Sequence, residues 1–360
     1  MKRHLYLLPL LLCLLAVPGC AEAAREEQAR QKPVQTPPAE IVNEQPRISF
    51  PGDPVELSIP PVLPEQPEGP RFAVIPSMVR LGEPVTIAYT DDFSGPGSKD
   101  FQAVLIDSRG IRLARVPLFS FIRTAVGQEV QAAVLTIPTT AASGPFLIRI
   151  EAGGRTIQDL PLIVEQREFI YEHIPLDEKN TELRTAEDEQ KDRESQILWA
   201  VLSRRGNDIY DGGPFTAPVG SARRTSFFGD RRLYEYIDGS TDRSIHAGID
   251  YGVPIGTEVR ACASGRVVLA AFRIVTGNSV VLEHFPGVYS LYYHMNNITV
   301  EENNFVRAGA VLGHSGDTGL ATGPHLHWEI RVAGETADPD VFLSRPVLDK
   351  DEILRNLTRY

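Results

Sequence analysis

Short apolar runs separated by glycine- and proline-rich turns constrain the fold of this chain more than any other feature. Within residues 72–165 these runs lie at 85–89, 103–106, 132–137, 146–150 and 160–164. Runs of this length and spacing are typical of an antiparallel β-sandwich. We therefore predict a mainly β protein in which residues 71–166 form an immunoglobulin-like β-sandwich. This segment contains no cluster of metal ligands or nucleophiles, so we expect it to position the protein or to bind a partner.

A charged stretch over residues 176–203 has a different pattern. Acidic and basic residues dominate it until four apolar positions near its end, Ile197, Leu198, Val201 and Leu202. This pattern indicates a charged helix whose C-terminal end packs on a core. We predict that residues 167–205 are a helical connector to a final domain over 206–345, with 346–360 as a C-terminal tail.

The first twenty residues have the pattern of an export signal. A basic start precedes an apolar segment, 5–17, that is too short for a comfortable membrane span. The segment ends in Val-Pro-Gly-Cys, which resembles a bacterial lipobox, although Pro18 departs from the usual small or aliphatic residue. We predict acyl chains on Cys20, with a plain signal peptide and an unrelated Cys as the alternative. A lipid anchor would hold the exported protein in the periplasm, at the inner or the outer membrane.

Residues 21–70 are rich in Pro, Glu and Gln. Such a segment favours extended states and cannot bury a core, so we expect a tether that lifts the folded part off a membrane. The formal net charge of the chain is -11. Because no Lys/Arg-rich run could follow a phosphate backbone, nucleic acid is not an expected partner.

Four histidines and one aspartate of the last domain form the pattern that carries chemistry. His246 and Asp250 are four residues apart in a glycine-rich segment that favours a strand, so both side chains would face one way. His325 and His327 are two residues apart on another predicted strand, and the apolar residues beside them would face the opposite side. His294 lies at the end of a third predicted strand.

This set of residues suits a zinc hydrolase. Catalytic zinc uses three protein ligands and leaves one position open for water. His246, Asp250 and one histidine of the later pair meet that count, and the remaining histidines could orient the water and stabilise an oxyanion. Each pair alone is a weak signal, because a His-x-His on a strand is more often a packed or surface pair.

Several separated motifs in the last domain strengthen the signal because they occur together. In sequence order they are Ser226-Phe227-Phe228-Gly229-Asp230-Arg231, His246-Ala247-Gly248-Ile249-Asp250-Tyr251-Gly252, Pro254-Ile255-Gly256-Thr257, Gly265-Arg266-Val267-Val268, Tyr292-Tyr293-His294, Gly313-His314-Ser315-Gly316-Asp317-Thr318-Gly319 and Thr322-Gly323-Pro324-His325-Leu326-His327-Trp328-Glu329. This succession resembles the lysostaphin/LytM-type zinc endopeptidases, which hydrolyse peptidoglycan, over most of residues 206–345. The upstream β-sandwich and charged helix resemble N-terminal regions of such peptidases in diderm bacteria such as spirochaetes.

The resemblance implies a mostly antiparallel β-sheet with a groove over one zinc ion. His246, Asp250 and His327 would bind the zinc, while His294 and His325 would flank the bound water as catalytic groups. The expected function is zinc-dependent hydrolysis of the peptide cross-links of peptidoglycan in cell-wall remodelling, with an envelope protein as a partner of the β-sandwich. The alternative is a catalytically silent LytM-like regulator that activates another cell-wall hydrolase, although such members usually lack zinc ligands.

Overall fold

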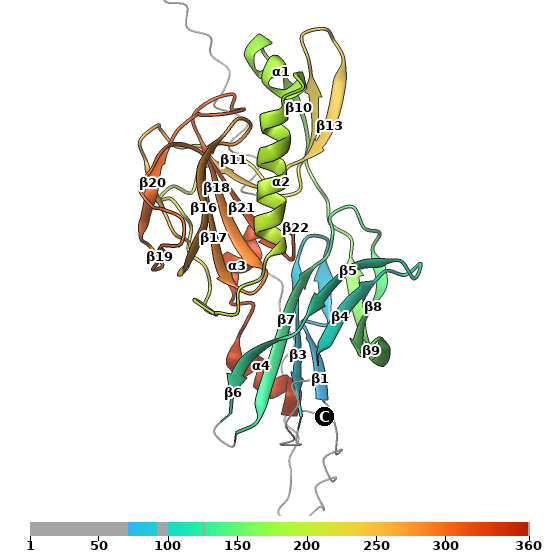
Figure 1. Ribbon diagram of the computed structural model, residues 1–360. Coiled ribbons are helices and arrows are strands. Elements are labelled where there is room, and N and C mark those ends of the chain that lie inside the picture. Colours follow the sequence, from blue (N-terminus) through green and yellow to red (C-terminus); the bar gives the residue numbers. More distant parts are fainter. Residues whose placement is uncertain (1–70, 92–99, 125–126, 359–360) are drawn as a thin grey trace, which may run out of the picture. The chain divides into compact units, whose positions relative to one another are not determined.

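Strands predominate over helices in the computed structural model, which describes residues 71–91, 100–124 and 127–358 (Figure 1). The predicted mainly β fold is confirmed. Cys20, the export signal and the tether over 21–70 lie outside the described residues. In the part that is described, no helix is both long and apolar enough to cross a membrane.

Two sheets enclose one apolar core in the described part of residues 71–165. The first sheet runs in order through Arg71–Ile75 (β1), Pro84–Thr90 (β3), Glu129–Thr136 (β7) and Phe119–Arg123 (β6). The second runs through Met78–Arg80 (β2), Arg155–Glu165 (β9), Gly144–Ala152 (β8), Phe101–Ile106 (β4) and Arg112–Pro117 (β5). Ile87 and Leu105, one from each sheet, are fully buried in the shared core. The immunoglobulin-like topology stays a prediction.

The C-terminal part is built on one large antiparallel sheet. Its strands lie in the order Arg224–Ser226 (β11), Gly248–Tyr251 (β14), Leu326–Val332 (β21), Val288–Ile298 (β18), Gly277–Phe285 (β17), Gly265–Arg273 (β16) and Phe305–Val306 (β19). Shorter strands pair beside this path: Glu258–Arg260 (β15), Val311–Ser315 (β20) and Glu335–Ala337 (β22). The register of β14 against β21 sets Gly248 opposite Glu329 and Asp250 opposite His327.

The strands at the centre of this sheet send alternate side chains to opposite faces. Leu326, Trp328 and Ile330 of β21 are fully buried in the main core, so His327 and Glu329 between them face the other side. On β18, Tyr293 pairs directly with His327. The predicted alternation of the His-Leu-His segment is therefore what the structure has.

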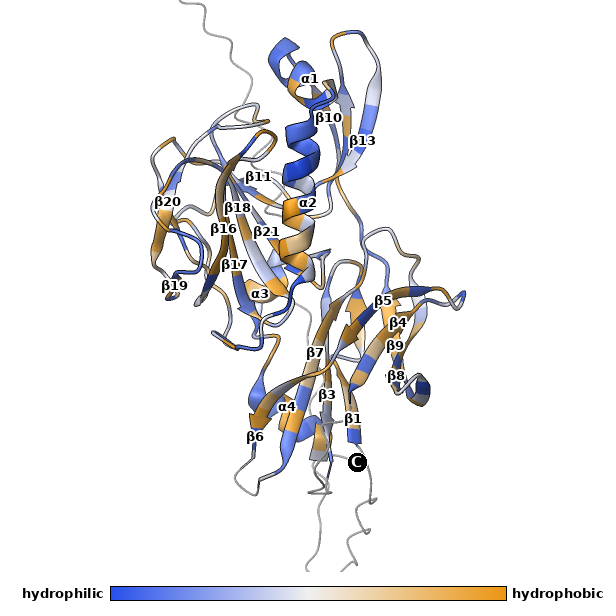
Figure 2. Cartoon of the chain, in the orientation of Figure 1, coloured by the Kyte–Doolittle hydropathy of each residue, from blue (hydrophilic) through white to orange (hydrophobic). Residues whose placement is uncertain are grey.

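Helices accompany the sheets at Glu178–Thr185 (α1), Glu189–Ser203 (α2), Pro339–Ser344 (α3) and Lys350–Thr358 (α4). Figure 2 shows α2 changing from hydrophilic to hydrophobic along its length. Leu202 at its C-terminal end, with Leu198 beside it, belongs to one apolar cluster with Leu269 of β16 and with Leu291 and Tyr293 of β18. This end of α2 therefore covers part of the sheet face that also carries His327.

The prediction of one continuous helix over 176–203 is wrong in one respect, since α1 and α2 are separate helices. Ala186 and Asp188, which lie between the two helices, have extended backbone conformations. The carboxylate of Asp188 accepts a hydrogen bond from the backbone N–H of Gln190. An Asp in this position is a favoured N-cap, so it starts a new helix.

A small sheet joins the connector to the C-terminal part. Tyr171–Pro175 (β10) pairs in parallel with Arg231–Glu235 (β12), which forms an antiparallel hairpin with Thr241–Ile245 (β13). The register places Glu172 opposite Arg232. A strand from the predicted helical connector is thus paired next to the segment that leads into His246.

We expect Gly248→Ala to disturb the pairing of β14 with β21. A Cβ at Gly248 would lie 2.2 Å from the carbonyl oxygen of Trp328, and backbone cannot swing aside as a flexible side chain can. The substitution should destabilise the folded protein by about 1–3 kcal/mol. It should also weaken zinc binding, because Asp250 would no longer lie opposite His327. Thermal unfolding and zinc titration of the full chain measure the two effects.

Gly220→Ala is the matched control for this substitution. An added Cβ at Gly220 would meet no atom within 4 Å, so neither unfolding nor zinc affinity should change. A Gly248→Ala protein that binds zinc as tightly as the Gly220→Ala protein would contradict the expectation.

Candidate metal centre

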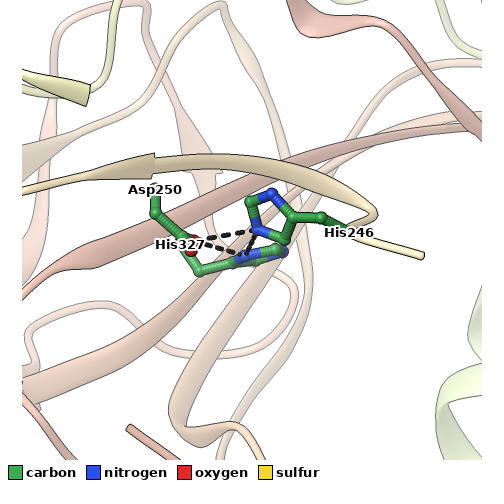
Figure 3. A group of neighbouring side chains, drawn as sticks. All are labelled: His246, Asp250 and His327. Carbon is green, nitrogen blue, oxygen red and sulfur yellow. Dashed lines mark hydrogen bonds and ion pairs between the residues drawn. The ribbon is translucent and has the colours of Figure 1, made fainter. Parts of the chain in front are cut away.

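Side chains from separate segments converge at one point on the large sheet, as Figure 3 shows for His246, Asp250 and His327. Nε2 of His246 lies 3.0 Å from both Oδ1 of Asp250 and Nδ1 of His327, and the last two atoms are 2.8 Å apart. All three residues are buried. The predicted zinc ligands therefore form a triangle of donor atoms, while their role as ligands stays a prediction.

Strand pairing positions Asp250 and His327, but it does not position His246. His246 lies between β13 and β14, where its N–H donates to the carbonyl of Asp230 and its carbonyl accepts from the N–H of Gly229, both at 2.8 Å. The prediction that His246 and Asp250 share one strand is wrong, because the loop at 229–230 takes up the backbone groups of His246. The two side chains converge nonetheless.

Each histidine of the triangle uses its second ring nitrogen to fix its orientation. Nδ1 of His246 donates to the carbonyl oxygen of Phe227 at 2.8 Å, and Nε2 of His327 faces Oε2 of Glu329 at 3.4 Å. The guanidinium of Arg331 in turn contacts Glu329. With a proton on each of these nitrogens, the other nitrogen presents a lone pair to the centre, which is the form of imidazole that binds a metal.

Burial and mutual contacts shift the pKa values of the triangle in opposite directions. Burial lowers the pKa of His246. Burial acts to raise the pKa of Asp250, but contacts with His246 and His327 outweigh it and hold that pKa well below its usual range. Burial likewise acts to lower the pKa of His327, yet hydrogen bonds to Asp250 and Glu329 raise it to about 9. The cluster therefore favours positive charge beside the Asp250 carboxylate.

The donor set fits a metal ion such as zinc. Catalytic zinc sites combine imidazole nitrogens and a carboxylate oxygen at about 2.0–2.2 Å from the metal and leave a position open. Here two nitrogens and one oxygen face each other in a buried site. His246, Asp250 and His327 could together hold such an ion.

His294 and His325 flank this triangle. Their ring centroids are 4.7 Å apart, and Nε2 of His325 lies 3.8 Å from Oδ1 of Asp250. Nδ1 of His294 donates to the carbonyl of Thr318, and Nδ1 of His325 to that of Gly323, each at 2.8 Å. Both rings are thereby oriented and keep Nε2 as a lone pair. The residues that we predict as catalytic lie beside the triangle, and their catalytic role stays a prediction.

His294 has an unusual backbone conformation. Its φ is 59°, in the left-handed region that few residues other than glycine adopt. His294 lies where β18 changes its pairing partner. The residue before it, Tyr293, pairs with β21, and the residue after it, Met295, pairs with β20. Burial and the neighbouring His325 and His327 lower the pKa of His294 to about 3. Backbone strain of this kind often occurs at functional sites, and here it holds a neutral imidazole beside the triangle.

Sequence reasoning missed the polar residues that support the triangle. Glu329 and Arg331 could have been found, because they follow His327 by two and four residues on the same strand and so face the same side. Arg232, whose Nη2 donates to Oδ2 of Asp250 at 2.8 Å, has no such local signal. The adjacent Arg231 faces elsewhere and donates to the carbonyl of Thr139 at 2.6 Å.

Comparison with known proteins finds similar sequences for the same region. The family model of peptidase family M23 matches residues 244–339. The chain is 44% identical over 105 residues to DD-carboxypeptidase/endopeptidase Mpg of Neisseria meningitidis serogroup B, which covers 29% of this chain and 24% of Mpg. It is 40% identical over 119 residues to peptidoglycan DD-endopeptidase ShyA of Vibrio cholerae, covering 32% of this chain and 27% of ShyA.

A third relative is lysostaphin of Staphylococcus staphylolyticus. It is 39% identical over 105 residues, which are 28% of this chain and 22% of lysostaphin. The chain therefore spans about a quarter of the length of the curated relatives that it matches. The likeness concerns the part of the chain that contains the triangle and its flanking histidines.

We expect His327→Ala to lose zinc and His294→Ala to keep it. The first substitution removes a donor atom of the triangle, so zinc affinity should fall by more than the roughly 10- to 100-fold typical of losing a supporting partner. The second removes a flanking ring. Zinc content of the full chain after dialysis, measured by atomic emission, tests both. If His327→Ala retains zinc, the zinc ligands are assigned wrongly. If His294→Ala loses zinc, the division between zinc ligands and catalytic histidines is wrong.

Proposed function

Because the chain carries a peptidase family M23 domain, we propose that it is a zinc-dependent endopeptidase that hydrolyses the peptide cross-links of peptidoglycan. The observation that carries the proposal is the close approach of the donor atoms of His246, Asp250 and His327, with His294 and His325 beside them. The name of the Vibrio cholerae relative includes peptidoglycan as its substrate, and this supports the choice of substrate class.

A zinc ion bound by His246, Asp250 and His327 would polarise the scissile carbonyl and lower the pKa of a water molecule. His294 and His325 supply the groups that handle protons. Each ring is fixed through Nδ1, so its Nε2 can accept a proton from the attacking water or stabilise charge on the carbonyl oxygen. The proton then goes to the departing amine as the C–N bond breaks. Burial and the neighbouring histidines lower the pKa of His294 to about 3, so its ring is neutral at the start of the reaction.

The ring of Tyr293 fixes the plane of His327 from the neighbouring strand. The two rings are stacked, with centroids 5.5 Å apart and an angle of 8° between their planes. Since Glu329 holds the edge of the same imidazole, the ring has little freedom to rotate. Such preorganisation keeps catalytic geometry in place without reorganisation during the reaction.

We further propose that the enzyme works in the periplasm, held at the inner or outer membrane by acyl chains on Cys20. The export pattern before Cys20 and a cell-wall substrate support the same compartment. In this arrangement the tether over 21–70 would give the folded part reach, and the β-sandwich would be the part that binds an envelope partner.

We expect the full chain to cleave isolated peptidoglycan and to release fragments that lack peptide cross-links. Mass spectrometry of the fragments identifies the bond. A zinc chelator should stop the release, and added zinc should restore it. His325→Ala should lower turnover by about 10²- to 10⁴-fold, the range typical of a group that transfers protons, while it keeps zinc.

A zinc-loaded full chain that leaves cross-linked peptidoglycan intact would contradict this proposal. If that protein nonetheless accelerated another cell-wall hydrolase, the silent regulator would be the better description. Cleavage that persists in His325→Ala at the rate of the unaltered protein would instead remove that histidine from the mechanism.

A further inference from the structure

Arg232 connects the metal centre to a strand of the connector. Its Nη2 donates to Oδ2 of Asp250 at 2.8 Å and to Oγ of Ser226 at 2.7 Å, while its Nε donates to Oε2 of Glu172 at 2.9 Å. Only 15% of the Arg232 side chain is exposed, so water competes little for these bonds. Glu172 belongs to β10, and the parallel register places it directly opposite Arg232.

These contacts divide the two oxygens of Asp250 between different tasks. Oδ1 faces Nε2 of His246 and Nδ1 of His327, whereas Oδ2 is bound to the guanidinium of Arg232. A guanidinium is planar and presents its N–H groups in a fixed fork. Because Glu172 holds one side of that fork, Arg232 cannot rotate freely, and the carboxylate plane of Asp250 is fixed with it.

The charges of this chain of contacts matter as much as its geometry. A guanidinium without an acidic partner next to Asp250 would partly neutralise the carboxylate that a metal cation needs, and it would repel the cation itself. Glu172 neutralises Arg232, and its side chain is only 23% exposed. The hydroxyl of Ser226 lies 3.0 Å from a carboxylate oxygen of Glu172 and 3.1 Å from one of Asp230, and it can donate its single proton to either. Asp250 can therefore keep its charge for the metal while Arg232 orients it.

We propose that Arg232 and Glu172 are positioning residues that hold Asp250 as a one-oxygen ligand of the metal. The strand β10 is then a working part of the metal centre, although it lies before residues 244–339, which match the peptidase family. This inference rests on the proposed metal site. A protein cut at residue 206 would contain the ligand residues but lack the partner that keeps Arg232 in place.

The sign of the effect on zinc affinity tests the proposal. If Arg232 were only a nearby positive charge, Arg232→Gln would tighten zinc binding. If it positions Asp250, Arg232→Gln should weaken binding about 10- to 100-fold, as is typical for supporting partners of metal ligands. Glu172→Gln, which keeps the shape of the side chain, should weaken binding in the same direction. Arg232→Lys keeps the charge without the fork and should rescue binding only in part.

Zinc affinity of the full chain is measured by competition with a chromogenic chelator, and metal-free thermal unfolding is recorded for each variant. The visible spectrum of the cobalt-substituted protein gives a readout that altered folding alone would not move. It should change in Arg232→Gln, because Asp250 becomes free to bring both oxygens to the metal and so to change its coordination geometry.

Arg224→Gln is the matched control. Arg224 lies on β11, which pairs with β14, and forms a two-bond ion pair with Asp340 of α3 at 2.8 and 2.6 Å. Its substitution should therefore leave zinc affinity and the cobalt spectrum unchanged. Zinc binding by Arg232→Gln that equals or exceeds that of Arg224→Gln would overturn the inference. If Arg232→Gln fails to fold, Glu172→Gln decides by the same comparison. An unaltered full chain that binds no zinc would overturn the proposed function, and this inference with it.

Discussion

The pairing of β14 with β21 is the contact on which the rest of the candidate metal centre depends. It sets Asp250 opposite His327 and Gly248 opposite Glu329, and the close approach at Gly248 leaves no room for a side chain. Since side chains alternate along a strand, a slip of one residue would send His327 into the core and Trp328 to the surface of the site. The fully buried Trp328 therefore holds the register that the donor atoms require.

This dependence explains which features could be predicted from the sequence. The spacing of His325 and His327 carries its own geometry, because a period of two is a local property of a strand. The apolar runs predicted the sheets because their length and the turns between them are also local properties of the sequence. His246 did not follow that rule, because its backbone bonds to Gly229 and Asp230 rather than to a ladder partner. Its convergence on Asp250 comes from tertiary contacts, which no local period encodes.

Arg232 shows the limit of such reasoning more clearly. It adjoins Arg231 in the sequence, and alternation predicts only that the two face opposite ways. Which one faces the metal centre is decided by the hairpin of β12 and β13, and its partner Glu172 comes from β10, sixty positions earlier. The same connector contains the break between α1 and α2, where a single Asp cap overrides an otherwise continuous helical pattern.

One arrangement recurs through the site and orients its donor atoms. Each of His246, His294 and His325 donates from Nδ1 to a backbone carbonyl, and His327 turns Nε2 to the Glu329 carboxylate. In every ring one nitrogen is held by a hydrogen bond, and the other nitrogen is not used in that bond. Asp250 follows the same logic, with one oxygen on Arg232 and the other toward the rings. Because the anchors lie in backbone and in buried ion pairs, the donor atoms have little freedom to move away from one another.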